Sequence, residues 1–123
     1  MIQRISKTII QDTLTTKLKG LNFDSEKARK ISEVFTLNSL EGVYSHGINR
    51  FARFVMYIRK GLISIDASPS IAFKNKAVQQ WNGNQGPGIL NAILATESAI
   101  HLSNNYGIGC VAMANTNHWM RGG

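Results

Sequence analysis

The chain has 123 residues, of which 43% are hydrophobic and 17% charged. This is a globular composition, and a chain of this length can bury a core of its own, so a disordered tail or linker is excluded. The 14 Lys and Arg against 7 Asp and Glu give a formal net charge of +7, which suits either a nucleic acid or an anionic small molecule as partner.

The basic residues are dispersed along the chain, with no run longer than a pair. No aromatic platform or nucleic-acid motif accompanies them, so we expect no nucleic-acid partner, although a basic nucleic-acid-binding module stays an alternative. The single Cys110 cannot form an internal disulfide and suits a reducing compartment. No apolar run reaches the roughly 18 residues of a membrane helix, and the N-terminus lacks a signal-peptide core. We therefore expect a cytoplasmic protein without a membrane partner.

Helical periodicity dominates residues 1–62. Three helices are expected: from a Ser6 N-cap to Gly20, from Asp24 or Ser25 to Glu41 and Gly42, and from about Gly47 to Lys60. We expect Gly20 to end the first helix in a left-handed conformation.

The period changes after Pro69, which predicts a sheet in residues 63–123. Two short strands are expected at residues 70–74 and 77–81, a fourth helix from Gly88 to about Asn104, and a strand at Ile108–Ala114. The last of these is continuously apolar, so we expect it to be covered on both faces. A strand, helix and strand in succession imply a crossover and a parallel pair. The predicted fold class is therefore α/β: N-terminal helices followed by a mixed sheet with a crossover helix.

The first candidate site lies in YSHGINRFARF, residues 44–54, where a helix begins. Backbone N–H groups at Gly47 and Ile48, together with an Arg50 guanidinium that can form two parallel bonds, predict a site for the carboxylate of a small acid. His46 would then stand beside the adjoining carbon, and an imidazole can protonate a developing alkoxide near neutral pH. The alternative is a surface histidine and arginine beside a helix cap.

The second candidate site is NTNHWMRGG, residues 115–123, directly after the apolar strand. Ligands of open α/β sheets collect outside the carboxyl ends of strands. The polar side chains placed there are Asn115, Asn117, His118 and Arg121. The alternative is a polar turn whose Trp119 is anchored in the core.

The glycine-rich stretch NGNQGPG, residues 82–88, opens a helix after a strand. Its spacing is neither G-x-G-x-x-G nor a GK[ST] loop, so we expect a tight turn that lets strand and helix pack. No metal site is expected, because the histidines and Cys110 show no ligand spacing. We expect His101 and Cys110 to be packing residues.

Three motifs in order, GVYSHGINRF, WNGNQGPG and GIG-VA-ANTNHWMRGG, resemble the malate/L-lactate dehydrogenase family that is distinct from the Rossmann-type lactate and malate dehydrogenases. The resemblance begins at about Ile5 and covers nearly the whole chain. It implies a non-Rossmann NAD(P)-dependent dehydrogenase fold and interconversion of 2-oxo and 2-hydroxy acids with NAD(H) or NADP(H), NADH being favoured here. It also implies a homodimer when the protein is full length.

The same resemblance implies roles for individual residues. His46 would donate a proton to the substrate carbonyl, Arg50 would bind the substrate carboxylate, and Ser45 would orient His46. We expect His118 and Arg121 to contribute to the substrate pocket, while the cofactor-binding residues stay unassigned.

Family members are far longer than this chain. We therefore expect residues 1–123 to be a single N-terminal portion of a longer oxidoreductase. Catalytic residues can then be present without a complete active site, so an inactive or interaction-only fragment is a further alternative.

Overall fold

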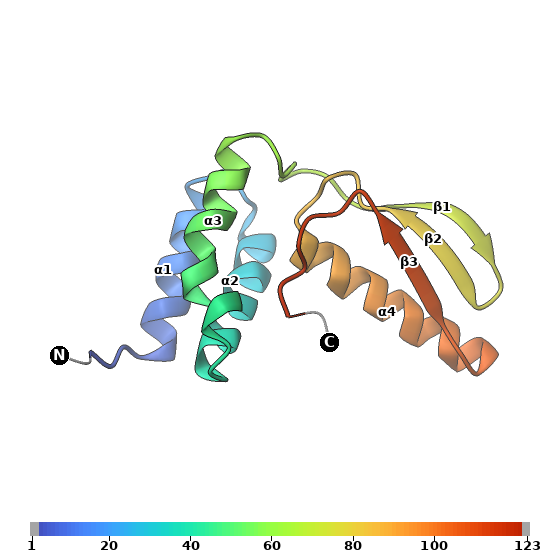
Figure 1. Ribbon diagram of the computed structural model, residues 1–123, viewed down its shortest axis with the longest axis horizontal. Helices are drawn as coiled ribbons and strands as arrows, with labels where there is room; N and C mark the ends of the chain where they lie inside the picture. The colour runs from blue at the N-terminus through green and yellow to red at the C-terminus, as the bar shows by residue number, and fades with distance from the viewer. Residues whose placement is uncertain (1–2, 122–123) are drawn as a thin grey trace. The chain divides into compact units, whose positions relative to one another are not determined.

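The computed structural model describes residues 3–121 (Figure 1). The chain divides into two compact units, Met1–Arg59 and Lys60–Gly123. The first holds α1 (Lys7–Lys19), α2 (Ser25–Leu40), a short 3-10 helix η1 (Tyr44–His46) and α3 (Ile48–Arg59). The second holds β1 (Ser70–Asn75), β2 (Val78–Asn82), α4 (Gly88–Tyr106) and β3 (Cys110–Ala114).

The helices of the first unit begin where their capping residues predict. The Ser6 hydroxyl accepts a hydrogen bond from the Ile9 N–H at 3.3 Å, and the Asp24 carboxylate accepts one from Lys27 at 2.8 Å. The left-handed ending expected at Gly20 is wrong, because its φ is −65°. The chain reverses two residues later instead, at Asn22, whose φ is 70°.

The core of the first unit is apolar and closed around α2. Ala28, Ile31 and Phe35 of this helix have no exposed surface. The Phe35 ring meets Phe51 of α3 edge to face at a centroid distance of 5.2 Å and Phe54 at 5.5 Å. The three helices therefore bury their apolar faces against one another.

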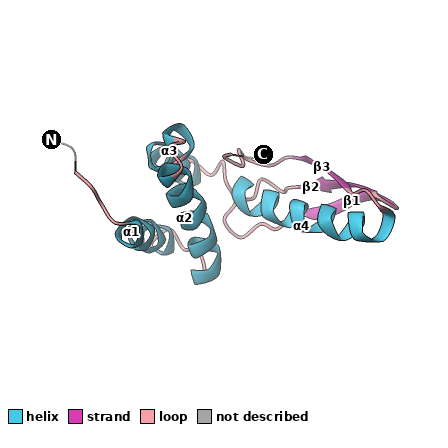
Figure 2. Cartoon of the chain, turned by 90° about the horizontal axis from the view of Figure 1, so that it is seen from below, coloured by secondary structure: helices cyan, strands magenta, loops and turns pink. Residues whose placement is uncertain are grey.

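The second unit is a three-stranded mixed sheet with α4 beside it, in the order β1-β2-β3 (Figures 1 and 2). β1 and β2 are antiparallel and joined through Lys76, whose φ is 48°, while β2 and β3 are parallel and connected by α4. The predicted mixed sheet and crossover helix are confirmed. α4 runs two residues beyond Asn104 and ends at Gly107, whose φ is 80°.

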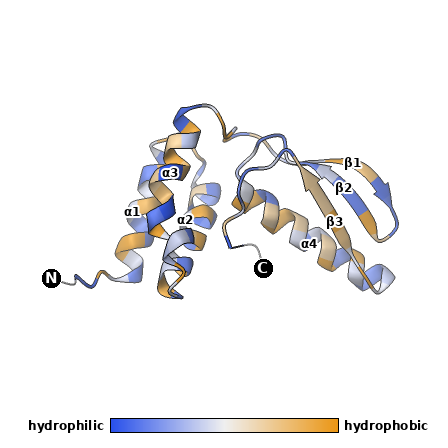
Figure 3. Cartoon of the chain, in the orientation of Figure 1, coloured by the Kyte–Doolittle hydropathy of each residue, from blue (hydrophilic) through white to orange (hydrophobic). Residues whose placement is uncertain are grey.

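The expectation that β3 is covered on both faces is wrong. Cys110, Ala112 and Ala114 are exposed, although the whole strand is apolar (Figure 3). Within the described residues β3 is an edge strand, so its outer backbone groups have no strand partner there. His101 and Cys110 are exposed too, which corrects their expected role in packing.

Candidate functional site

His46 is held by hydrogen bonds to its side chain and to its backbone. The Ser45 hydroxyl lies 2.9 Å from His46 Nδ1, so the contact to Ser45 occupies this ring nitrogen. The buried Asn38 of α2 donates its side-chain amide to the His46 carbonyl at 2.9 Å. A buried side chain of α2 thus fixes the backbone that carries the His46 ring.

The start of α3 does not offer the anion site that the spacing predicts. The Ile48 N–H donates to the Ser39 hydroxyl at 2.9 Å, and the Gly47 N–H donates to the Tyr44 carbonyl at 3.2 Å. A side chain on Gly47 would collide with Ser39, so the glycine admits α2 rather than a ligand. This part of the prediction is wrong, because the Ser39 hydroxyl of the preceding helix already accepts from the Ile48 N–H and the Tyr44 carbonyl already accepts from the Gly47 N–H.

Arg50 lies in the first turn of α3 and is half-buried. Its backbone N–H donates to the Gly47 carbonyl at 2.9 Å, which ties the arginine to the turn that follows His46. None of the ion pairs within residues 3–121 involves Arg50. A guanidinium without a carboxylate of its own is suited to bind that of a ligand.

The loop after β3 places the other candidate residues in the second unit. His118 and Arg121 are exposed. The Met120 N–H donates to His118 Nδ1 at 2.8 Å. Trp119 is 48% exposed and Met120 only 5%, so the alternative of a turn anchored by Trp119 is wrong and Met120 is the anchor.

The glycine-rich turn at residues 82–88 packs against this loop. Gly88 lies against the carbonyl groups of Asn117 and His118, where a β-carbon would not fit. The buried Asn91 of α4 donates to the Gly83 carbonyl at 3.0 Å and to the Thr116 hydroxyl at 2.9 Å. The predicted role of the turn in packing is confirmed.

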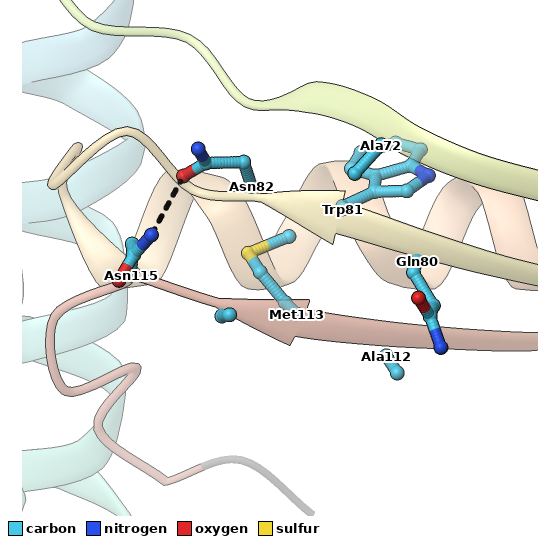
Figure 4. A pocket seen from close by; sticks show the side chains of 8 residues that line it. Ala72, Gln80, Trp81, Asn82, Ala112, Met113 and Asn115 are labelled. Atoms are coloured by element: carbon cyan, nitrogen blue, oxygen red, sulfur yellow. Dashed lines mark hydrogen bonds between the residues drawn. The ribbon is translucent and has the colours of Figure 1, made fainter.

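An open hollow of about 430 Å³ lies on the sheet of the second unit (Figure 4). Its lining includes Trp81, Met113, Asn82 and Asn115, and the last two share a hydrogen bond of 3.4 Å. Gln79 contacts Ser98 of α4, and side chains alternate along a strand, so the neighbouring Gln80 points to the face away from α4. The hollow is shallow and mostly apolar, and none of the described residues that line it is charged.

Neither a metal site nor a membrane-spanning helix is found in the described part of the chain. No group of three or more His, Cys, Asp or Glu there is arranged to hold a metal ion. No helix among these residues has the length and apolarity to span a membrane.

Sequence reasoning missed the residues that support the site. Asn38, Ser39 and Asn91 act through contacts 8 or 9 positions away and, for Asn91, also 25 positions away. Asn38 and Asn91 interrupt apolar helix faces and are buried. A polar residue on a buried face was the available signal.

The fold is that of a dehydrogenase. Malate dehydrogenase from Entamoeba histolytica superimposes with a TM-score of 0.91 at 29% identity, over 97% of this chain and 33% of that one. Sulfolactate dehydrogenase from Methanocaldococcus jannaschii superimposes with a TM-score of 0.90 at 28% identity, over 94% of this chain and 34% of that one.

Residues 5–123 match the family described as malate/L-lactate dehydrogenase. The chain therefore belongs to the malate/L-lactate dehydrogenase family. It is 44% identical over 100 residues to the 2,3-diketo-L-gulonate reductase of Escherichia coli O139:H28, covering 81% of this chain and 30% of that protein. The corresponding reductase of Salmonella newport is 42% identical over 106 residues, covering 86% of this chain and 32% of that protein. The chain thus spans about a third of the length of these relatives.

Proposed function

We propose that this chain carries the substrate side of an NAD(P)H-dependent 2-oxo acid reductase, with 2,3-diketo-L-gulonate as its substrate. The observation that carries the proposal is the contact of 2.9 Å between Ser45 and His46, with Arg50 in the next turn of chain. The substrate assignment rests on similarity to the two bacterial reductases and on the NHWMRGG motif, which resembles that of the same enzyme.

His46 supplies the proton in this proposal. Reduction adds a hydride to the keto carbon, and the oxygen becomes an alkoxide that takes a proton from Nε2 of a His46 imidazolium. The Ser45 hydroxyl can accept from a protonated Nδ1 or donate to an unprotonated one. The hydrogen bond between Ser45 and His46 therefore persists whichever state the ring adopts, which suits a residue that gains and loses protons in each cycle.

Arg50 binds the carboxylate of the substrate. A guanidinium can hold both carboxylate oxygens through two parallel bonds, which fixes the plane of the acid and with it the position of the adjacent keto group. The backbone hydrogen bond from Arg50 to Gly47 keeps this anchor next to His46 in the chain. Carboxylate binding thus falls to the side chain rather than to the start of the helix.

The nicotinamide cofactor, which we propose to be NADH, supplies the hydride when it is bound. The glycine-rich turn does not fit its phosphates. The Gly83 N–H donates to Ala114, the Gln85 N–H to Asn115 and the Gly86 N–H back to Gly83, so these amides are already used. We therefore assign no cofactor contact to the described residues.

The proposed function also includes an oligomeric state and a location in the cell. We propose a cytoplasmic homodimer for the full-length enzyme. Because the chain spans 30% of the E. coli relative, the second candidate function is an interaction-only portion that binds a longer subunit without catalysis.

Two assays separate these candidates. The first follows NADH oxidation by the purified chain with 2,3-diketo-L-gulonate. The second uses a chimera in which residues 5–123 replace the matching segment of the E. coli reductase. Turnover by the chimera that depends on His46 is expected, and turnover by the chain alone would exclude the interaction-only candidate. A correctly folded chimera that oxidises no NADH would contradict the reductase proposal.

A further inference from the structure

An open hollow of about 360 Å³ lies in the first unit, where α1 and α3 end. Its lining comes from the last turns of α1, the turn that follows and the last residue of α3: Thr13, Thr16, Lys17, Gly20, Leu21 and Arg59. Because α3 has 12 residues, its last residue lies roughly 16 Å along the helix from Ile48, which follows the His46 turn. The hollow is therefore separate from the candidate active site.

Two positive charges line this hollow. Lys17 and Arg59 are both exposed, and none of the described residues of the lining is Asp or Glu. Neither cation takes part in an ion pair within residues 3–121. Like charges on one hollow repel each other, and an anion bound there would offset that repulsion. The lining thus favours an anionic ligand.

The helix ends determine how much negative charge the hollow can bind. Both α1 and α3 end here, and a helix C-terminus carries about half a negative charge. Together with the two cations, these helix ends leave a net charge of about +1. A monoanion such as a carboxylate fits that charge better than a phosphate dianion does.

The hollow also offers a hydrogen-bond acceptor. At the end of α1 the Leu21 N–H donates to the Leu18 carbonyl at 2.9 Å, and the Gly20 N–H donates to the Thr16 carbonyl at 3.0 Å. The Lys17 carbonyl between these two accepts no hydrogen bond within residues 3–121. It lies 3.4 Å from the position that a β-carbon on Gly20 would occupy. Since glycine has no side chain there, a ligand hydroxyl can reach this carbonyl and donate to it.

We propose that the hollow binds a small carboxylic acid that also carries hydroxyl groups. Lys17 and Arg59 bind its carboxylate, the Lys17 carbonyl accepts from one of its hydroxyls, and the half-buried Leu21 packs against its carbon chain. Binding at this site needs neither the nicotinamide cofactor nor turnover, so it is independent of the proposed function.

The test is a titration of the ¹⁵N-labelled 123-residue chain with sodium gluconate at constant ionic strength, followed by nuclear magnetic resonance. The amide resonances of Gly20, Leu21 and Arg59 are expected to shift and to saturate. Butyrate has the carboxylate without hydroxyls, glucose has hydroxyls without charge, and glucose 6-phosphate carries more negative charge, so each should bind more weakly. No saturable shift with gluconate, equal affinity for butyrate, or tighter binding of glucose 6-phosphate would overturn the proposal.

Two variants test the charges. Lys17→Gln and Arg59→Gln are each expected to weaken gluconate binding by about 3- to 5-fold, since an exposed charge pair contributes little. The matched controls are Lys19→Gln and Arg53→Gln, which remove the same charges from exposed residues of the same helices outside the lining. An equal loss of affinity in the controls would show general attraction to a basic chain and would overturn the site.

Gly20→Leu fills the hollow without changing a charge. The φ of Gly20 is −65°, which a leucine can adopt, and the atoms nearest to the added β-carbon are the Lys17 and Thr16 carbonyl oxygens at 3.4 and 3.6 Å. We expect the variant to fold and to lose gluconate binding, and unchanged affinity in the folded variant would contradict the proposal. Should it not fold, the charge variants decide. No readout uses NADH oxidation, so failure of the reductase proposal would be recognised separately.

Discussion

His46 in the helical unit and His118 in the sheet unit are both held at Nδ1, but by different kinds of group. The partner of His46 is a hydroxyl at 2.9 Å and that of His118 is a backbone N–H at 2.8 Å. A hydroxyl can reverse its role as the ring titrates, whereas an amide cannot. The two rings therefore differ in whether the partner of Nδ1 can follow a change in the protonation of that nitrogen.

The contacts that hold the backbone of the two histidines also differ between the units. His46 follows a helix whose core is closed by aromatic contacts between Phe35 and α3. His118 follows an exposed strand, and its loop is fixed by the side-chain amide of Asn117 instead. Hydrogen bonds between loops thus do in the second unit what apolar packing does in the first.

The largest effect is expected from His46→Ala in the chimera. Loss of the proton donor should lower kcat by about 10² to 10⁴ while largely sparing cofactor binding. Steady-state NADH oxidation measures this, with His101→Ala, an exposed histidine of α4, as the control. Near-normal turnover would remove His46 from the mechanism and with it the contrast between the two rings.

Arg50→Lys should have the next largest effect. An ammonium cannot reproduce two parallel bonds to a carboxylate, so KM should rise and kcat/KM fall by roughly 10- to 100-fold. The control is Arg53→Lys, an exposed arginine of the same helix. An unchanged KM would place the substrate carboxylate elsewhere.

Ser45→Ala tests whether the partner of Nδ1 matters for His46, because it removes the hydroxyl that contacts this nitrogen. One neutral hydrogen bond corresponds to about a 3- to 10-fold change, which we expect in kcat. Ser25→Ala, at an exposed serine in the first turn of α2, serves as control. Equal kcat values for the Ser45 variant and the parent chimera would show that the hydroxyl does not orient the ring.

Ser39→Ala is expected to have the smallest effect, and that effect is on stability. The substitution removes the hydroxyl that accepts a hydrogen bond from the Ile48 N–H. The loss should destabilise the first unit by about 1 kcal/mol. Urea unfolding of the 123-residue chain, followed by circular dichroism, measures it, again against Ser25→Ala. A midpoint unchanged from that of the parent would mean that solvent replaces the serine at no cost.

Much of this architecture could be predicted because its signals are local. Ser6 and Asp24 lie within three residues of the N–H groups they cap. The apolar period that changes after Pro69 separates helices from sheet, and a helix between two strands implies the parallel pair of β2 and β3. These features depend on neighbours in the sequence.

The wrong predictions share a different cause. Each one concerns which distant part of the chain packs against a residue, and spacing in the sequence does not show that. The spacing around Gly47 shows a glycine but not the Ser39 hydroxyl that needs its space. The apolar run of β3 shows what the strand is made of, not what covers it. Likewise the carbonyl groups that bind Asn117 lie 31, 32 and 55 positions away, so no pattern of spacing indicates them.

Cys110 makes the exposed edge of β3 accessible to spectroscopy. It is the single cysteine of the sequence and is exposed at the first position of that strand. A nitroxide spin label could be attached to its thiol without an engineered residue. At the unpaired edge of β3 the label would have rapid local motion. A segment that added a strand beside β3 would slow that motion, so the electron spin resonance line shape would report such pairing.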